Sequence, residues 1–197
     1  FMVKLTAVPS DVGYNLAISM VPALVGIGSF GLLYNMVRLS GGSRKTALGF
    51  GLVAPALVII TAIDIEHQII PDVITLPGIA LGLVVGTYTI GYADSLFGFF
   101  AGGGLFYLLA VLSNGGMGGG DIKYIAAVGA LLGWQKVLLV IFIGALLGSV
   151  VGVFQITVQK KSRKSLIPFG PFLATGTLVT LFFGNSLIRL YLEYLGR

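Results

Sequence analysis

Long apolar stretches, separated by short polar or glycine-rich segments, make up most of the chain. A helix needs about 20 predominantly apolar residues to cross the hydrocarbon core of a bilayer. Only helices and closed barrels satisfy backbone polar groups there. The pattern therefore predicts an all-α fold, a polytopic membrane bundle of six or seven transmembrane helices in a single domain over residues 1–197. The expected spans are Asn15–Val37, Thr46–Ile63, Val73–Tyr92, Ser95–Leu112, Ile122–Trp134, Val137–Val158 and Leu173–Tyr194.

Two details refine this bundle. The span Ile122–Trp134 is short, so it either tilts or begins inside a re-entrant loop. Small residues recur within other spans, as in Ala101–Gly104 and Gly144–Gly148. Small residues let helix backbones approach closely in lipid, so we expect tight helix packing at these positions.

The amino-acid composition supports a membrane protein and argues against a soluble domain, a nucleic-acid-binding protein and a disulfide or Cys-based metal protein. Hydrophobic residues make up 56% of the 197 positions and charged residues 10%, whereas soluble domains carry about 25% charged residues. The net charge of +5 comes from bases that are dispersed or lie beside apolar runs. Such bases meet lipid headgroups, so we expect lipids and not nucleic acid as partners. The sequence contains no cysteine, which excludes disulfides and Cys-based metal sites.

Alternation of the spans across the membrane brings the acidic residues together. Asp64, Asp72 and Asp121 fall on one membrane face, each at the edge of an apolar stretch. Lysine and arginine are shared equally between the two faces, so the positive-inside rule does not identify the cytoplasmic side.

Asp64 and Asp121 form a candidate catalytic pair. Ionisable residues in the membrane are costly, so their presence suggests a functional site. Asp64 directly follows the second expected span, at the last turn of its helix, and Asp121 follows Gly118-Gly119-Gly120. Glycines let a backbone come close to the carboxylate. Two close carboxyl groups share a proton and can serve as general acid and base on a water. This is aspartic peptidase chemistry, which needs no metal and no cofactor.

The helix ends predict which aspartate holds the proton. Asp121 lies near a helix N-terminus, where negative charge is favoured, and Asp64 near a C-terminus, where it is disfavoured. We therefore predict that Asp64 is protonated in the resting state.

Simpler interpretations exist for each of these residues. Asp72 and Asp121 both fit the role of a helix cap. Asp64 fits a residue that merely lies at the membrane interface. His67 lies near Glu66 and Asp72, but three firm ligands with fixed spacing are not evident, so we expect a solvated turn and no metal site. The two acids also suit a small ion- or proton-coupled transporter, which the residues alone leave open.

Three segments resemble the type IV prepilin peptidases, which are membrane aspartyl proteases of the GxGD class. They are Ile63–Pro77, Gly116–Gln135 and the proline-rich Ile167-Pro168-Phe169-Gly170-Pro171-Phe172, in that order. The short GxGD motif is weak alone, and the three segments together carry the resemblance.

The resemblance implies a specific reaction and place. That family removes the short charged leader from type IV prepilins and pseudopilins, after a glycine just ahead of the hydrophobic helix. Cleavage occurs at the cytoplasmic face of the inner membrane, so we expect a multi-pass protein with its active site facing the cytoplasm. The catalytic aspartates of the family match Asp64 and Asp121. Further matching positions, expected to support the site or bind substrate, are Asp72, Gly118, Gly119, Gly120, Lys123 and Pro168.

One departure from the family pattern concerns a second activity. Many members carry a cytoplasmic domain with paired cysteines, associated with N-methylation of the new pilin terminus. Because this sequence has no cysteine, we expect that domain to be absent. A presenilin-like peptidase is a further alternative, but Pro22-Ala23-Leu24 and Pro55-Ala56-Leu57 precede the GxGD loop, whereas the Pro-Ala-Leu motif of those enzymes follows it. A structural assembly protein would not need the two acids.

Overall fold

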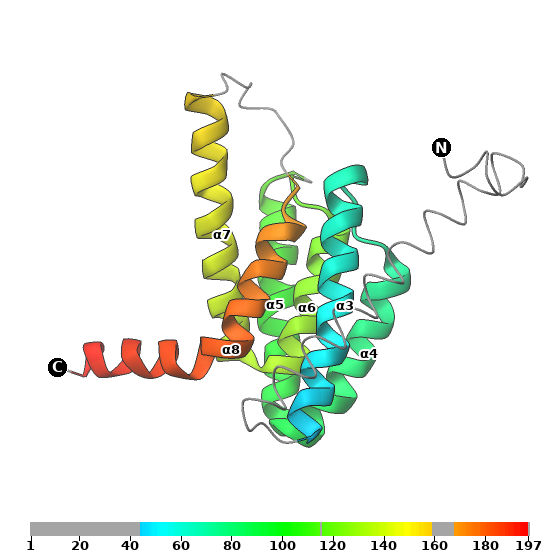
Figure 1. The fold of residues 1–197 in the computed structure, drawn as a ribbon, viewed down its shortest axis with the longest axis vertical. Coiled ribbons are helices and arrows are strands. Elements are labelled where there is room, and N and C mark those ends of the chain that lie inside the picture. Colours follow the sequence, from blue (N-terminus) through cyan, green and yellow to red (C-terminus); the bar gives the residue numbers. More distant parts are fainter. Residues whose placement is uncertain (1–43, 115, 159–167, 197) are drawn as a thin grey trace, which may run out of the picture. The chain divides into compact units, whose positions relative to one another are not determined.

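A computed structural model describes residues 44–114, 116–158 and 168–196 (Figure 1). The first expected span, Asn15–Val37, and residues 159–167, which follow the span Val137–Val158, lie outside these residues. Residues 63–197 form one compact unit, which contains every candidate site residue. The six described helices are α3 (Arg44–His67), α4 (Asp72–Thr89), α5 (Tyr92–Leu112), α6 (Gly119–Leu132), α7 (Trp134–Thr157) and α8 (Gly170–Leu195).

All regular structure in the described residues is helical, which confirms the predicted all-α membrane bundle. Helices α4, α5, α7 and α8 are each long and apolar enough to cross a membrane. Their bounds agree with the predicted spans to within three residues. Helix α6 has only 14 residues, or about 21 Å at 1.5 Å per residue, so the short fifth span is confirmed.

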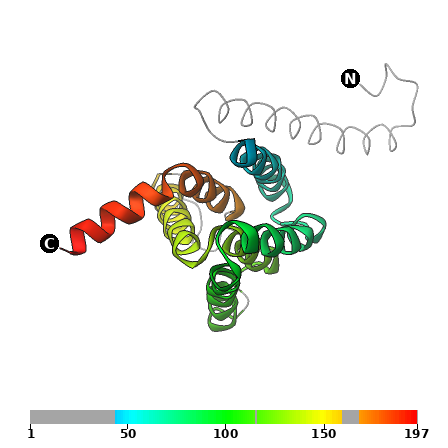
Figure 2. The ribbon, with the colours of Figure 1, turned by 90° about the horizontal axis from the view of Figure 1, so that it is seen from below.

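Helix α6 contacts α4, α5, α7 and α8. Figure 2 shows these helices along their axes, with the last part of α8 pointing outward. The close packing of α6 requires glycine on its neighbours. A Cβ atom at Gly82 of α4 would lie 2.7 Å from the carbonyl oxygen of Ala127, and one at Gly102 of α5 would lie 2.7 Å from that of Ile125. At Gly98 of α5 and Gly129 of α6 the two backbones touch, so a Cβ on either would overlap the carbonyl oxygen of the other.

Buried hydrogen bonds join α6 to two of its neighbours. The Ser95 hydroxyl of α5 donates to the Ala130 carbonyl at 2.8 Å. Tyr124 of α6 and Thr177 of α8 are joined through their hydroxyl groups at 2.8 Å. Thr177 donates its one hydroxyl hydrogen to the Leu173 carbonyl, so Tyr124 is the donor to Thr177. The first bond joins α5 to the end of α6, and the second holds the early turns of α8 beside those of α6.

Candidate active site

Asp64 lies in the last turn of α3, and its side chain points into the protein. The residue is only 5% exposed. Its backbone carbonyl accepts the Gln68 N–H at 2.9 Å, and Gln68 has a left-handed backbone with φ of 54°. This conformation ends α3 and turns the chain toward α4. The buried Asp64 carboxyl group therefore lies just before the turn that joins α3 to α4.

The start of α8 provides a partner for Asp64. The Gly170 N–H donates to Asp64 Oδ2 at 2.8 Å, and this bond is buried. Gly170 is the first residue of α8, where backbone N–H groups have no partner within the helix. A Cβ at this position would lie 2.8 Å from Oδ2 and 3.0 Å from Asp64 Cγ, so only glycine fits without displacement. Sequence reasoning missed this contact because 106 positions separate the two residues.

Asp121 lies in the first turn of α6. Its carboxyl group lies beside the backbone of Gly118, the N-cap residue, and the charge of Asp64 acts on it. The Oδ1 atom of Asp121 is buried and has no hydrogen-bond partner within the described residues. The two predicted acids thus lie at the ends of separate helices, near enough for the charge of one to act on the other.

The three glycines before Asp121 differ in what they contact. A Cβ at Gly120 would lie 2.8 Å from both the Cβ and the carbonyl oxygen of Ile70, in the segment that follows Asp64. One at Gly118 would lie 3.1 Å from Asp121 Oδ2, and one at Gly119 would meet nothing within 4 Å. The pattern Gly-x-Gly-Asp therefore has a steric explanation, because its two fixed glycines are the crowded ones.

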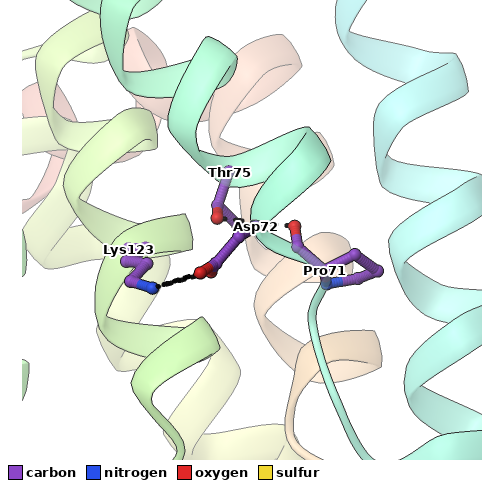
Figure 3. A network of polar contacts seen from close by, with 4 residues as sticks. All are labelled: Pro71, Asp72, Thr75 and Lys123. Carbon is purple, nitrogen blue, oxygen red and sulfur yellow. Dashed lines mark hydrogen bonds and ion pairs between the residues drawn. The ribbon is translucent and has the colours of Figure 1, made fainter.

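Asp72 and Lys123 form an ion pair between α4 and α6 (Figure 3). The Lys123 ammonium group lies 2.7 Å from both carboxylate oxygens of Asp72. Pro71 occupies the N-cap position of α4 and Asp72 is the first helical residue, without a side-chain capping bond. The N-cap interpretation of Asp72 is therefore wrong, since its carboxylate points to Lys123 instead. The pair joins the start of α4 to the turn that carries Asp121.

The remaining predicted residues lie around this centre. Pro168 is half-buried and stands two residues before Gly170. Glu66 and His67 are exposed and 3.9 Å apart, as expected of a solvated turn. Within residues 44–114, 116–158 and 168–196, no three His, Asp or Glu side chains are grouped closely enough to hold a metal ion.

An apolar hollow of about 310 Å³ adjoins the start of α8. It lies between α7 and α8, and Phe169 in its wall immediately precedes Gly170. The lining residues are Ala145, Gly148, Ser149, Phe169 and Phe172. Apolar surface therefore lies next to the segment that contacts Asp64.

Comparison with known proteins identifies the family. The sequence profile of the Type IV leader peptidase family matches residues 52–153, which includes Asp64 and Asp121. A Legionella pneumophila protein named prepilin leader peptidase/N-methyltransferase is 33% identical over 147 residues, covering 70% of this chain and 50% of the relative. Proteins of the same name from Pseudomonas aeruginosa and Stutzerimonas stutzeri are 35% and 32% identical, covering 76% and 83% of this chain.

The match covers only part of those relatives. It includes 52% of the Pseudomonas aeruginosa protein and 59% of the Stutzerimonas stutzeri protein, so the chain spans about half the length of these relatives. No solved structure gives a significant match. Since the profile covers more than half of the 197 residues, and since the paired acids lie within it, the chain belongs to the Type IV leader peptidase family.

Proposed function

We propose that this protein is a membrane-embedded aspartic endopeptidase that removes the leader peptide of type IV prepilins or pseudopilins. Membership of the leader peptidase family supports the reaction class. The names of the relatives support prepilins as substrates. The proposal concerns the peptidase reaction alone, without the N-methylation that those names also include.

The observation that carries the proposal is the pairing of Asp64 with Asp121. Both carboxyl groups lie at helix ends, and they interact electrostatically with one another. The contact of Gly120 with Ile70 and that of Gly170 with Asp64 hold the three participating segments together. A pair of carboxyl groups in a protected site, sharing one proton, is the arrangement that activates water in aspartic peptidases.

The reaction follows from this pair. A water attacks the carbonyl carbon of the scissile peptide bond while one carboxylate accepts a proton from that water. The other, protonated carboxyl group donates a hydrogen bond to the carbonyl oxygen, where negative charge develops. Collapse of the tetrahedral intermediate breaks the C–N bond, and the proton taken from water passes to the leaving amine. Neither step requires a metal ion or a cofactor.

The substrate can be oriented by the apolar surface near the pair. The hydrophobic helix that follows the cleavage site would lie among the membrane helices, and the hollow at Phe169 and Phe172 offers apolar contacts beside Gly170. The charged leader would stay in water. We infer an inner-membrane location with the Asp64 and Asp121 ends of the helices facing the cytoplasm, where prepilins meet the membrane.

Mutation of the two acids tests the proposal. Asp64→Ala and Asp121→Ala should each abolish cleavage of a prepilin in membrane vesicles while the melting temperature of the purified protein changes little. Asp94→Ala is a matched control, because Asp94 is an exposed aspartate in the first turn of α5. Full cleavage by either site mutant would refute the pair.

The transporter interpretation predicts a different result. In that case proteoliposomes containing the wild-type protein would show ion-dependent uptake and no prepilin cleavage, and the two alanine variants would lose uptake. Cleavage by the wild-type protein, lost in both variants, excludes transport as the role of the acids.

A further inference from the structure

The two carboxyl groups of the proposed site have unequal hydrogen-bond partners. Asp64 Oδ2 accepts the Gly170 N–H at 2.8 Å within a buried contact. Asp121 Oδ1 is buried and accepts no hydrogen bond from any described residue. A hydrogen bond to the charged form of an acid favours ionisation, and burial without a donor disfavours it. Asp64 is also buried, so the buried Asp121 Oδ1 atom, which lacks a donor among the described residues, distinguishes Asp121 from Asp64.

Each acid also lies at a helix N-terminus, but in a different way. Asp121 is in the first turn of its own helix, α6. Asp64 meets the N-terminus of another helix, α8, through a direct bond to its first N–H. Helix N-termini favour negative charge in both places, so the macrodipoles do not decide between the two acids. The backbone of Gly118 also favours the ionised form of Asp121, as that of Gly170 does for Asp64. The buried Oδ1 atom of Asp121, which has no donor among the described residues, therefore remains as the difference.

Among the described residues near the site, the other charged and titratable side chains have partners or face solvent. Glu66 and His67, which follow Asp64 in α3, are exposed. At the start of α4, the carboxylate of Asp72 is neutralised by Lys123 of α6. Tyr124 of α6 donates its hydroxyl hydrogen to Thr177 of α8.

We propose that Gly170 is a positioning residue of the site: its backbone N–H holds Asp64 as the carboxylate, and the proton shared by the pair resides on Asp121. This assignment rests on the proposed function only for its catalytic consequence. Asp64 would accept a proton from the attacking water, and Asp121 would transfer its proton to the substrate carbonyl oxygen, which gives a neutral diol intermediate. When the C–N bond breaks, Asp64 passes its proton to the amine, and the hydroxyl of the intermediate returns a proton to Asp121.

This assignment is opposite to the one predicted from sequence. That prediction follows from the helix to which each acid belongs, and Asp64 does lie in the last turn of α3, as predicted. The N-terminus of α8 approaches the same carboxyl group from a distant part of the chain, which local sequence does not indicate.

Infrared titration of single-acid variants tests the assignment without any substrate. The protonated-carboxyl band is followed with pH in Asp64→Asn, which retains Asp121, and in Asp121→Asn, which retains Asp64. The spectrum of the double variant is subtracted to remove the other acids. We expect the band of Asp121 to persist to a pH at least about one unit higher than the band of Asp64. Equal midpoints, or the reverse order, would overturn the assignment.

A second measurement tests the part played by Gly170. Replacing residue 170 by glycolic acid turns its N–H into an ester oxygen with almost no change in shape. In the Asp121→Asn background, this change should raise the titration midpoint of Asp64 by about one pH unit, because the carboxylate loses a hydrogen bond. The matched control is an ester at Tyr92, which is likewise the first residue of a helix and is exposed. An unchanged midpoint in the residue 170 ester would overturn the role of Gly170.

Gly170→Ala gives a genetically encoded version of the same test. Its Cβ would lie 2.8 Å from Asp64 Oδ2, so the carboxylate must move away from the N–H. Gly104→Ala is the control, because a Cβ at Gly104 meets nothing within 4 Å. We expect the Asp64 midpoint to rise in the first variant alone, and a midpoint that stays the same in both would contradict the proposal. If the wild-type protein cleaves no prepilin, the proposed function fails while these titrations still decide where the proton lies.

Discussion

Replacing Gly120 by alanine should shift the position of Asp121 without changing its carboxyl group. The added methyl group would lie 2.8 Å from the Cβ and the carbonyl oxygen of Ile70. Carbon atoms in contact prefer separations of about 3.5–4.0 Å, so the start of α6 must move away by about 0.7 Å or more. Neither contacting atom is the end of a flexible side chain, so the backbone has to absorb this movement.

The displacement should affect catalysis more than stability. Catalytic groups need placement within about 0.5 Å, and a displacement of about 1 Å can cost about 100-fold in rate. Since Asp121 directly follows Gly120, we expect kcat/KM for prepilin cleavage to fall by roughly 10- to 100-fold. Overpacking of this kind typically lowers the free energy of unfolding by about 1–3 kcal/mol.

Cleavage rate and thermal unfolding of the purified protein would be measured side by side, with Gly119→Ala as the comparison. A Cβ at Gly119 meets nothing within 4 Å, so that variant should unfold at the wild-type temperature. Any loss of activity in Gly119→Ala then reports on substrate contact and not on packing. The steric reasoning is refuted if the Gly120 and Gly119 variants have the same melting temperature and the same kcat/KM.

Three further predictions concern contacts around α6. Asp72→Lys and Lys123→Asp should each lower the rate of prepilin cleavage several-fold, and the double reversal should restore most of that rate. In thermal unfolding, the coupling between the two residues should be about 0.2–1 kcal/mol, as is usual for partly exposed ion pairs. Additive losses in the double variant would contradict the ion pair. Tyr124→Phe should lower the free energy of unfolding by about 1–2 kcal/mol, because the buried Thr177 hydroxyl loses its donor. Adding Thr177→Val should recover part of that loss. An unchanged melting temperature in Tyr124→Phe would count against the hydrogen bond. Gly98→Ala should prevent normal packing of α5 on α6 and leave little folded protein on size-exclusion chromatography, and a wild-type elution profile would show that the backbones are not in contact.

The helices, and the position of the two acids at helix ends, were predictable from sequence for physical reasons. Apolar length determines where a chain can cross a bilayer, so the bounds of α4, α5 and α7 follow closely from the pattern. Alternation of spans then puts Asp64 and Asp121 on one face. This placement on one face, together with the glycine-rich loop before Asp121, was enough to predict that the two acids lie near one another.

The contacts between distant segments were not predictable in the same way. Asp72 and Lys123 were both expected near the site, but nothing in their spacing indicated that they bind one another across 51 positions. Three identical glycines also look equivalent in the sequence, whereas the packing against Ile70 distinguishes Gly120 from Gly119. Such differences arise from packing between segments that are distant in the sequence, and local sequence patterns do not indicate which segments pack together.

The length of α6 has a consequence for how water reaches the peptide bond. At about 21 Å the helix is about 9 Å shorter than a hydrocarbon core of about 30 Å. The chain before it, including Asn114 with its left-handed φ of 51°, must make up this difference without helical hydrogen bonds. Backbone groups at that depth need protein or water as partners, because lipid offers none. A hydrated depression should therefore extend below the headgroups at this end of α6, delivering the reactant that hydrolysis consumes.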